Sequence, residues 1–333
     1  MDVPMNIRPA KVSELEEIAE LQHIVFRPNE PESPVRYLAY AKEDPTYTLN
    51  HSRVIEVDGR LVAHLRVWDR TLMVNGVQLS AAGIGSLCVH PNYRSRGYAQ
   101  ALMADSERYF FEAGYDFGLL FTIIGTPFYE ALDWIPIPLP TFSFEAMNVM
   151  CDGALVRELE IGRDLDDVMG VHHADGMSHS GSVVRNRAYW TSGPAKIRST
   201  FPQWGVVHDD HVVAYVNFGV DEEDVWIKEA CALPNNNLAY AHLASLLLQH
   251  SQGKRLAGSL PRDHALVLTL ETMSQAAAVW GTDDHMMVKG VNWRLMREKL
   301  GADAVPSAKP ENEEPFWKAL FGGDVFYWDT DVF

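Results

Sequence analysis

Apolar and polar residues alternate in segments that predict strands and helices in turn along the first part of the chain. The pattern predicts strands at 5–9, 47–57, 61–74 and 77–89 and a helix at 12–26. The dipeptides Asp58-Gly59 and Asn75-Gly76 stand between consecutive strands, where these residue types are typical of a tight hairpin turn. The pattern therefore predicts an α/β fold in which helices flank a mixed, mostly antiparallel, twisted sheet.

The segment after strand 77–89 predicts an anion-binding helix terminus. Apolar residues recur at helical spacing after Gly97, at Ala99, Leu102, Met103, Phe110 and Ala113. Gly114 stands where a glycine ends a helix, and Gly97 where the helix begins. Unpaired N–H groups and the positive end of the helix dipole meet there, so a pyrophosphate could bind over the segment Arg94, Ser95, Arg96, Gly97, Tyr98 and Ala99. The alternative is a surface turn with two solvated arginines.

The order Val89-x-Pro91 followed by Arg94-x-x-Gly97-x-Ala99 resembles the acyl-coenzyme-A loop of the GNAT superfamily of N-acetyltransferases. A second apolar strand at 117–122 and the segment 127–134 follow in the order of that family. Asp133 stands where its tyrosine-containing turn usually has glycine. The resemblance covers about residues 5–146. It implies a GNAT fold, acetyl-CoA as co-substrate, and acetyl transfer to a primary amine by direct attack in a ternary complex.

The resemblance also implies roles for particular residues. Backbone groups around Leu87, Cys88 and Val89 would pair with the pantetheine arm and polarise the thioester carbonyl. Tyr129 matches the tyrosine that protonates the leaving thiolate, and a phenol of ordinary pKa, about 10, is a usable donor at neutral pH. The alternative for Tyr129 is a core tyrosine bonded to a carbonyl group.

The base that accepts the amine proton is not evident from the sequence. Residues 77–90 contain no aspartate or glutamate, although many relatives have a glutamate on this strand. By resemblance, the terminal carboxylate of Phe333 is one candidate; His90, Asp69 and a chain of water molecules are others. The amine could also lose its proton to solvent before it binds.

The pattern restarts near residue 150. Residues 209–216 resemble 58–65, a strand is predicted at 225–232, and a helix follows from Ala239. The intervening Pro234-Asn235-Asn236-Asn237 has neither arginine nor glycine, so this copy is predicted to be degenerate. The predicted divisions are an acetyl-CoA-binding domain at 1–148, a degenerate copy at 149–300, and a linker with an aromatic tail, docked on the core, at 301–333.

The arrangement of two tandem copies followed by an aromatic carboxyl-terminal segment resembles that of the mycobacterial enhanced-intracellular-survival (Eis-like) acetyltransferases. Those proteins carry a full third domain, whereas about thirty tail residues stand here. The resemblance implies that the chain end reaches the first domain's active site and that the protein forms a homo-oligomer.

Composition limits the remaining functions. The 333 residues include 47% hydrophobic residues, without a leader-like start or an apolar run near about 18 residues, so we expect a cytoplasmic protein without a membrane partner. A net charge of −17 disfavours nucleic acid and favours a small cationic amine acceptor. The three cysteines lack metal-ligand spacing, and His172, His173 and His179 with Asp175 are expected in a solvated loop, so no metal is predicted. The alternative function is a catalytically silent acyl-CoA-binding sensor or scaffold.

Overall fold

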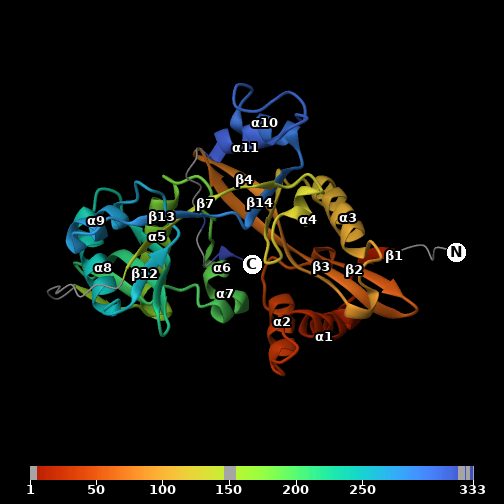
Figure 1. Cartoon of the computed structure of the whole chain (residues 1–333), viewed down its shortest axis with the longest axis horizontal. Helices are drawn as coiled ribbons and strands as arrows, with labels where there is room; N and C mark the ends of the chain where they lie inside the picture. Colours follow the sequence, from red (N-terminus) through yellow and green to blue (C-terminus); the bar gives the residue numbers. More distant parts are fainter. Residues whose placement is uncertain (1–5, 146–154, 322–326, 328–330, 333) are drawn as a thin grey trace.

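Two seven-stranded mixed sheets form the two lobes of the computed structural model, which describes residues 6–145, 155–321, 327, 331 and 332 (Figure 1). In spatial order, the first sheet consists of β1 (Asn6–Pro9), β2 (Ser52–Val57), β3 (Arg60–Val74), β4 (Val77–Val89), β5 (Phe117–Phe121), β14 (Met286–Gly290) and β6 (Ile135–Pro136). The second consists of β8 (Val156–Glu158), β9 (Trp204–His208), β10 (His211–Val220), β11 (Asp224–Ala232), β12 (Arg255–Gly258), β7 (Leu139–Phe144) and β13 (Val279–Asp283).

Helices cover both faces of each sheet. The first lobe carries α1 (Leu15–Phe26), α2 (Ser33–Lys42), α3 (Tyr98–Ala113) and α4 (Pro127–Glu130), with short 3₁₀ turns at Val12–Glu14, Leu49–His51 and Pro91–Tyr93. The second carries α5 (Ile161–Gly176), α6 (Arg187–Thr191), α7 (Gly193–Arg198), α8 (Asn237–His250) and α9 (Ala265–Ser274), and the last two helices are α10 (Trp293–Leu300) and α11 (Glu314–Phe321). In the described ranges, no helix combines the length and the apolar character needed to cross a membrane.

The predicted hairpin turns and most of the predicted strands of the first lobe are confirmed; the strand expected at 47–57 begins only at Ser52, because residues 49–51 form a 3₁₀ turn. Asp58 and Gly59 both have positive φ, at 49° and 75°, and so do Asn75 and Gly76, at 48° and 76°. Positive φ at both central residues is typical of the two-residue hairpin turn that Asp-Gly and Asn-Gly favour. β3 is buried along nearly its whole length because α1 contacts it on one face and α3 on the other.

The two sheets follow the same plan, and each takes one strand from the other half of the chain. In the first sheet, β5 pairs in parallel with β4, the second strand of the β3–β4 hairpin. In the second sheet, β12 pairs in parallel with β11, the second strand of the β10–β11 hairpin. The next strand along is β14 in the first sheet and β7 in the second. The structure therefore has two tandem copies of one fold, as predicted, but the expected boundaries at residues 148 and 300 do not separate the two sheets.

The second copy differs at the start of the helix that corresponds to α3. The side-chain oxygen of Asn236 accepts the N–H of Ala239 at 3.2 Å and so caps α8 from within the protein. This N–H is thereby used internally and is not available to a ligand; the degeneracy of the second copy stays a prediction. The expectation of a solvated loop at 172–179 is wrong for His172 and Asp175, which are buried on α5.

The carboxyl-terminal segment packs against the first lobe. Trp317 and Phe321 of α11 are buried, and the ring centroids of Trp317 and Phe117 lie 5.3 Å apart. Within the segment predicted as a linker and tail, Glu313 is buried: its Oε2 atom accepts the N–H of Gly290 at 2.7 Å and the indole N–H of Trp317 at 2.9 Å. A buried carboxylate thus joins α11 to the end of β14.

Candidate functional site

A cleft opens in the first lobe where β4 and β5 separate. The two strands pair from Ala81 and Phe117 to Ile84 and Leu120, and in the described part of the chain no pair continues beyond. Ser86 has a φ of 52°, and the register of β4 against β3 shifts at this point, so β4 bulges away from β5. The cleft has a volume of about 710 Å³ and a largely apolar lining.

The open edge of β4 leaves backbone N–H groups directed into the cleft. His90 donates its N–H to the carbonyl of Val62 on the β3 side at 2.8 Å. Successive N–H groups of a strand point to opposite sides, so those of Val89 and Leu87 point away from β3. These are groups that could pair with an amide-containing arm or polarise a carbonyl oxygen.

The amino-terminal end of α3 closes one end of the cleft. Gly97 caps the helix with a φ of 80°, and the first bond of the helix runs from the N–H of Ala101 to the carbonyl of Gly97 at 3.0 Å. The N–H groups of Tyr98, Ala99 and Gln100 therefore have no acceptor among the described residues. Because the positive end of the helix dipole lies at the same point, this terminus suits an anion.

The structure brings most of the predicted coenzyme-binding residues to this cleft. Its lining includes Leu87, Cys88, Val89, Arg94, Ser95, Gly97, Tyr98 and Ala99. Arg96 lies outside the lining: its guanidinium is 5.1 Å from the ring centroid of Tyr93 and donates to the carbonyl of Asn92 at 3.2 Å. Among the described residues that line the cleft, Arg94 alone carries a charge. Burial raises the pKa of the Cys88 thiol to about 12, so this cysteine is an inert core residue.

Tyr129 lies on α4 at the wall of the cleft, and it is 8% exposed. Burial raises the pKa of its phenol, which therefore stays protonated at neutral pH. The carbonyl of Tyr129 accepts the N–H groups of Leu132 and Trp134 at 2.9 and 3.1 Å. Asp133 has a φ of 61° in this turn, so the position does require the left-handed conformation that glycine adopts most easily.

Two of the candidate bases lie away from the cleft. The ring nitrogen Nδ1 of His90 accepts the N–H of Asn92 at 3.2 Å. Burial raises the pKa of Tyr115, and the charge of the neighbouring Asp69 carboxylate raises it further. Neither residue lines the cleft. Phe333, the third candidate, lies outside the described residues.

The described part of the tail joins the two lobes beside the cleft. Tyr327 packs on Phe121, a cleft residue, with ring centroids 4.8 Å apart. The Asp331 carboxylate accepts from Nε and Nη2 of Arg185 at 2.9 and 2.7 Å and from the Tyr189 hydroxyl at 2.5 Å. Arg198 donates to the carbonyl of Val332. Residues 327, 331 and 332 therefore contact both the first sheet and the second lobe.

A group of buried ionisable residues lies behind this tail contact. His172, Glu229 and Cys231 have potential metal-ligand atoms within 4.8 Å of one another. Glu229 already accepts two hydrogen bonds from Arg185, at 2.9 and 2.8 Å, and the Arg185 charge, against the effect of burial, lowers the pKa of Glu229. The Nε2 atom of His172 bonds to the carbonyl of Val183 at 2.9 Å. These internal partners account for the group without a cation, which the Arg185 charge would repel.

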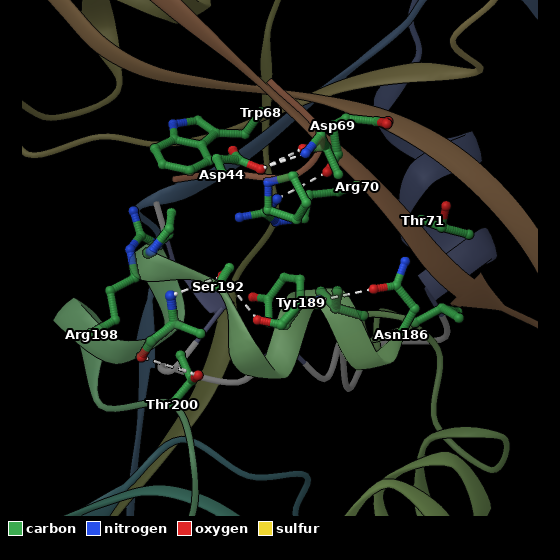
Figure 2. Close-up of a pocket in the computed structure, with 16 residues that line it drawn as sticks. Asp44, Trp68, Asp69, Arg70, Thr71, Asn186, Tyr189, Ser192, Arg198 and Thr200 are labelled. Atoms are coloured by element: carbon green, nitrogen blue, oxygen red, sulfur yellow. Dashed lines mark hydrogen bonds between the residues drawn. The ribbon is translucent and has the colours of Figure 1, made fainter. Parts of the chain in front are cut away.

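A second cavity, which the sequence did not predict, lies between the lobes and has a volume of about 120 Å³ (Figure 2). Trp68 and Arg70 from β3 face Tyr189 and Arg198 from α6 and α7 across it. One signal was present in the sequence: Arg66, Trp68 and Arg70 recur with the period of two that places them on one face of β3. The residues that complete the cavity, at 183–200, are far away along the chain.

A comparison with protein families finds one match, and it lies in the first lobe. Residues 6–137 match the model of an acetyltransferase (GNAT) domain. Among solved structures, the chain resembles a probable N-acyltransferase from Enterococcus faecalis, with 17% identity, a TM-score of 0.72, and coverage of 89% of this chain and 75% of that one.

Two further structures resemble the chain over a similar share of its length. A GCN5-related N-acetyltransferase from Anabaena variabilis shows 17% identity and a TM-score of 0.69 over 86% of this chain and 73% of that one. Eis1 from Mycobacterium abscessus shows 16% identity and a TM-score of 0.61, with the same coverage of 86% and 73%. No curated protein sequence matches the chain. At these identities the structural likeness establishes the fold.

Proposed function

Because residues 6–137 form an acetyltransferase domain of the GNAT family, we propose that the protein is an acetyl-CoA-dependent N-acetyltransferase. It transfers the acetyl group to the primary amine of a small molecule by direct attack, with coenzyme and acceptor bound together. The observation that carries this proposal is the free amino-terminal end of α3 at the point where β4 and β5 separate.

The residues around the cleft fit the chemistry of an acyl carrier with a diphosphate. The free N–H groups of Tyr98, Ala99 and Gln100 can donate to phosphate oxygens, and Arg94 supplies a neighbouring positive charge. Gly97 has no atoms within 4 Å of the position that a Cβ would occupy, so a phosphate can approach the backbone closely. The apolar walls and the open edge of β4 suit the arm that carries the acetyl group.

Three tasks remain for acetyl transfer, and the cleft offers a group for two of them. The N–H of Leu87 or Val89 polarises the thioester carbonyl as negative charge develops on its oxygen. The protonated phenol of Tyr129 donates to the leaving thiolate. The third task is removal of the amine proton, for which the carboxylate of Phe333 remains the candidate that the Eis-like resemblance supplies.

Two measurements test the proposal together. Calorimetric titration with acetyl-CoA should show stoichiometric binding, and a thiol-release assay with a panel of primary amines should show turnover for at least one of them. Binding without turnover on any amine would contradict the enzyme and support a catalytically silent acyl-CoA-binding protein. Absence of binding would contradict both functions.

A further inference from the structure

A continuous series of contacts links the core of the second lobe to the wall of the coenzyme cleft. We propose that Arg185 is a positioning residue for the reaction: it holds Asp331, and through Asp331 and Tyr327 it fixes the side chain of Phe121 in the cleft wall. These four residues are called the relay below. The second copy of the fold thus serves the reaction as the anchor of the carboxyl-terminal segment. This inference rests on the proposed function, because Phe121 affects catalysis only if the cleft holds the acyl carrier.

Arg185, the first residue of the relay, is held from both lobes. The segment before it lies along the end of β3, where the N–H of Val184 donates to the carbonyl of Thr71 at 2.8 Å. Nη1 and Nη2 of Arg185 donate to the two oxygens of Glu229 on β11 at 2.9 and 2.8 Å. The guanidinium also lies 4.5 Å from the ring centroid of Trp190 on α6. Because its contacts come from the first sheet and from the second lobe, Arg185 has a fixed place relative to both.

The Asp331 carboxylate, the second member of the relay, accepts three hydrogen bonds. One oxygen accepts from Nε of Arg185 at 2.9 Å and from the Tyr189 hydroxyl at 2.5 Å, and the other accepts from Nη2 of Arg185 at 2.7 Å. The side chains of Asp331 and Arg185 are both 0% exposed. A charge-assisted pair away from water is costly to separate, because each charge would be left buried without its partner. The backbone at Asp331 is therefore held in one place.

Tyr327 connects this fixed backbone to the first lobe. Its hydroxyl donates to the backbone carbonyl of Asp331 at 3.2 Å, and its ring centroid lies 4.8 Å from that of Phe121. Tyr327 is buried in the same apolar cluster as Phe117 and Trp317. One tyrosine therefore contacts the anchored backbone with its hydroxyl group and the cleft wall with its ring.

Phe121 lies where β4 and β5 have begun to separate. The described pairs of these strands end at Ile84 and Leu120, and Phe121 is the next residue of β5 and lines the cleft. The ring of Tyr327 therefore supports the wall at the point where the acyl-carrying arm would lie. In a site that orients two reactants, a displacement of about 1 Å can lower the rate about 10²-fold. The start of α3, where the diphosphate would bind, has no part in the relay, so loss of the relay should reduce turnover more than coenzyme affinity.

Alanine variants of the relay test its effect on turnover, measured with saturating acetyl-CoA and the best amine of the panel. Asp331→Ala and Tyr327→Ala should each lower kcat about tenfold or more, while the Kd of CoA changes by less than about threefold. The double variant should lose no more than the worse single variant, because both substitutions break the same series of contacts. An unchanged kcat in Asp331→Ala, losses that multiply in the double variant, or an equal loss of CoA affinity would overturn the proposal.

Two further variants test the anchor itself. Asp166→Ala is the matched control, because Asp166 also pairs with an arginine of the second lobe, Arg187, but its side chain is 82% exposed. It should keep the kcat of the parent. Arg185→Lys should lower kcat as Asp331→Ala does, since one ammonium group cannot reproduce the paired bonds to Asp331 and Glu229. Full activity in Arg185→Lys, or an equal loss in Asp166→Ala, would contradict the assignment.

Amide hydrogen exchange separates the relay from the proposed function, because it requires no turnover. The reporter is the N–H of Thr122, which follows Phe121 and donates to the carbonyl of His285 at 2.9 Å. Asp331→Ala should speed exchange there about tenfold or more, and Asp166→Ala should leave it as in the parent. Faster exchange in Asp331→Ala alone supports the relay even if no amine is acetylated. Unchanged exchange in Asp331→Ala would overturn the relay, and acetylation of an amine by the parent would still support the acetyltransferase proposal.

Discussion

Two neighbouring arginines that look alike in the sequence have different surroundings in the fold. Both donate to a nearby backbone carbonyl, Arg94 to that of Val89 at 3.3 Å and Arg96 to that of Asn92 at 3.2 Å. Arg94 lines the cleft beside the end of α3, whereas Arg96 lies over the ring of Tyr93, outside the cleft lining. A charged side chain affects a bound phosphate only within a short distance, since solvent screens exposed charges. The motif therefore predicted a positive loop, and the loop's conformation selects which arginine faces the ligand.

We expect Arg94→Ala to weaken coenzyme binding about ten- to hundredfold, because a hydrogen bond to a charged group contributes about 1.5–3 kcal/mol. Isothermal calorimetry with CoA measures the change. Arg96→Ala is the matched control, with the same charge removed two positions away, and should alter affinity little. Equal losses in both variants would mean that the two arginines act only through general charge.

Tyr129→Phe should reduce kcat about 10²- to 10⁴-fold, the usual contribution of a general acid, with little change in the Kd of CoA. Burial raises the phenol pKa, so the acid stays protonated and the parent's activity should be lost only above about pH 10, where the phenol ionises. The variant should lack that alkaline limb in its pH profile. Tyr109→Phe, outside the cleft, serves as control, and unchanged turnover in Tyr129→Phe would remove it from the acid's role.

At the scale of secondary structure, the site is the meeting point of a helix start and a bulged strand. The cleft exists because β4 bends at Ser86 while β5 ends, and α3 begins at a glycine with positive φ. In the second lobe, the corresponding helix α8 is capped by the side chain of Asn236. The two copies of one fold thus differ in how the start of this helix is capped.

Gly97→Ala should destabilise the protein by about 1–2 kcal/mol, because an L-residue in the left-handed conformation costs about that much. It should also weaken CoA binding, since the strained turn displaces the free N–H groups. Gly59→Ala is a matched control: its φ is 75° against 80° for Gly97, and both have open space around the added Cβ.

Urea unfolding should show similar losses of stability for the two glycine variants, and calorimetry should show lost coenzyme affinity for Gly97→Ala alone. Full affinity in a folded Gly97→Ala protein would exclude the α3 terminus as the binding point. If Gly59→Ala also lost coenzyme affinity, the loss in Gly97→Ala would result from reduced stability of the protein and would not point to the α3 terminus.

At the scale of the whole molecule, the exchange of β7 and β14 makes the lobes dependent on each other. Met286, Met287 and Val288 of β14 are fully buried in the first sheet, between β5 and β6. A first lobe without β14 would expose the edge of β5 and the apolar surface that these residues cover.

We therefore expect residues 1–148, expressed alone, to lack a cooperative thermal transition and to bind CoA poorly. Co-expression with residues 149–333 should restore both properties, because β14 can then pair with β5. Circular dichroism melting and calorimetry measure the two properties. A fragment 1–148 that melts cooperatively and binds CoA like the full chain would show that the exchanged strand is dispensable.

The end of the chain allows a second test at this scale, because its described part is held by Arg185, Tyr189 and Arg198. Deletion of Phe333 moves the terminal carboxylate back by one residue, about 3.3–3.6 Å. If that carboxylate accepts the amine proton, kcat should fall at least tenfold. Phe333→Ala keeps the carboxylate and should retain most activity. Unchanged rates after deletion would make the terminal carboxylate a bystander.

The sequence by itself determined the strands at 61–74 and 77–89, their hairpin turns, the start of α3 at Gly97 and the turn after Tyr129. These features depend on consecutive residues, because turns and helix ends follow from local φ, ψ and hydrogen-bonding preferences. Only the tertiary structure decided the strand exchange, the buried position of His172 and the cavity between the lobes. Each of these depends on packing between segments far apart along the chain, and local preferences do not specify which distant segments meet.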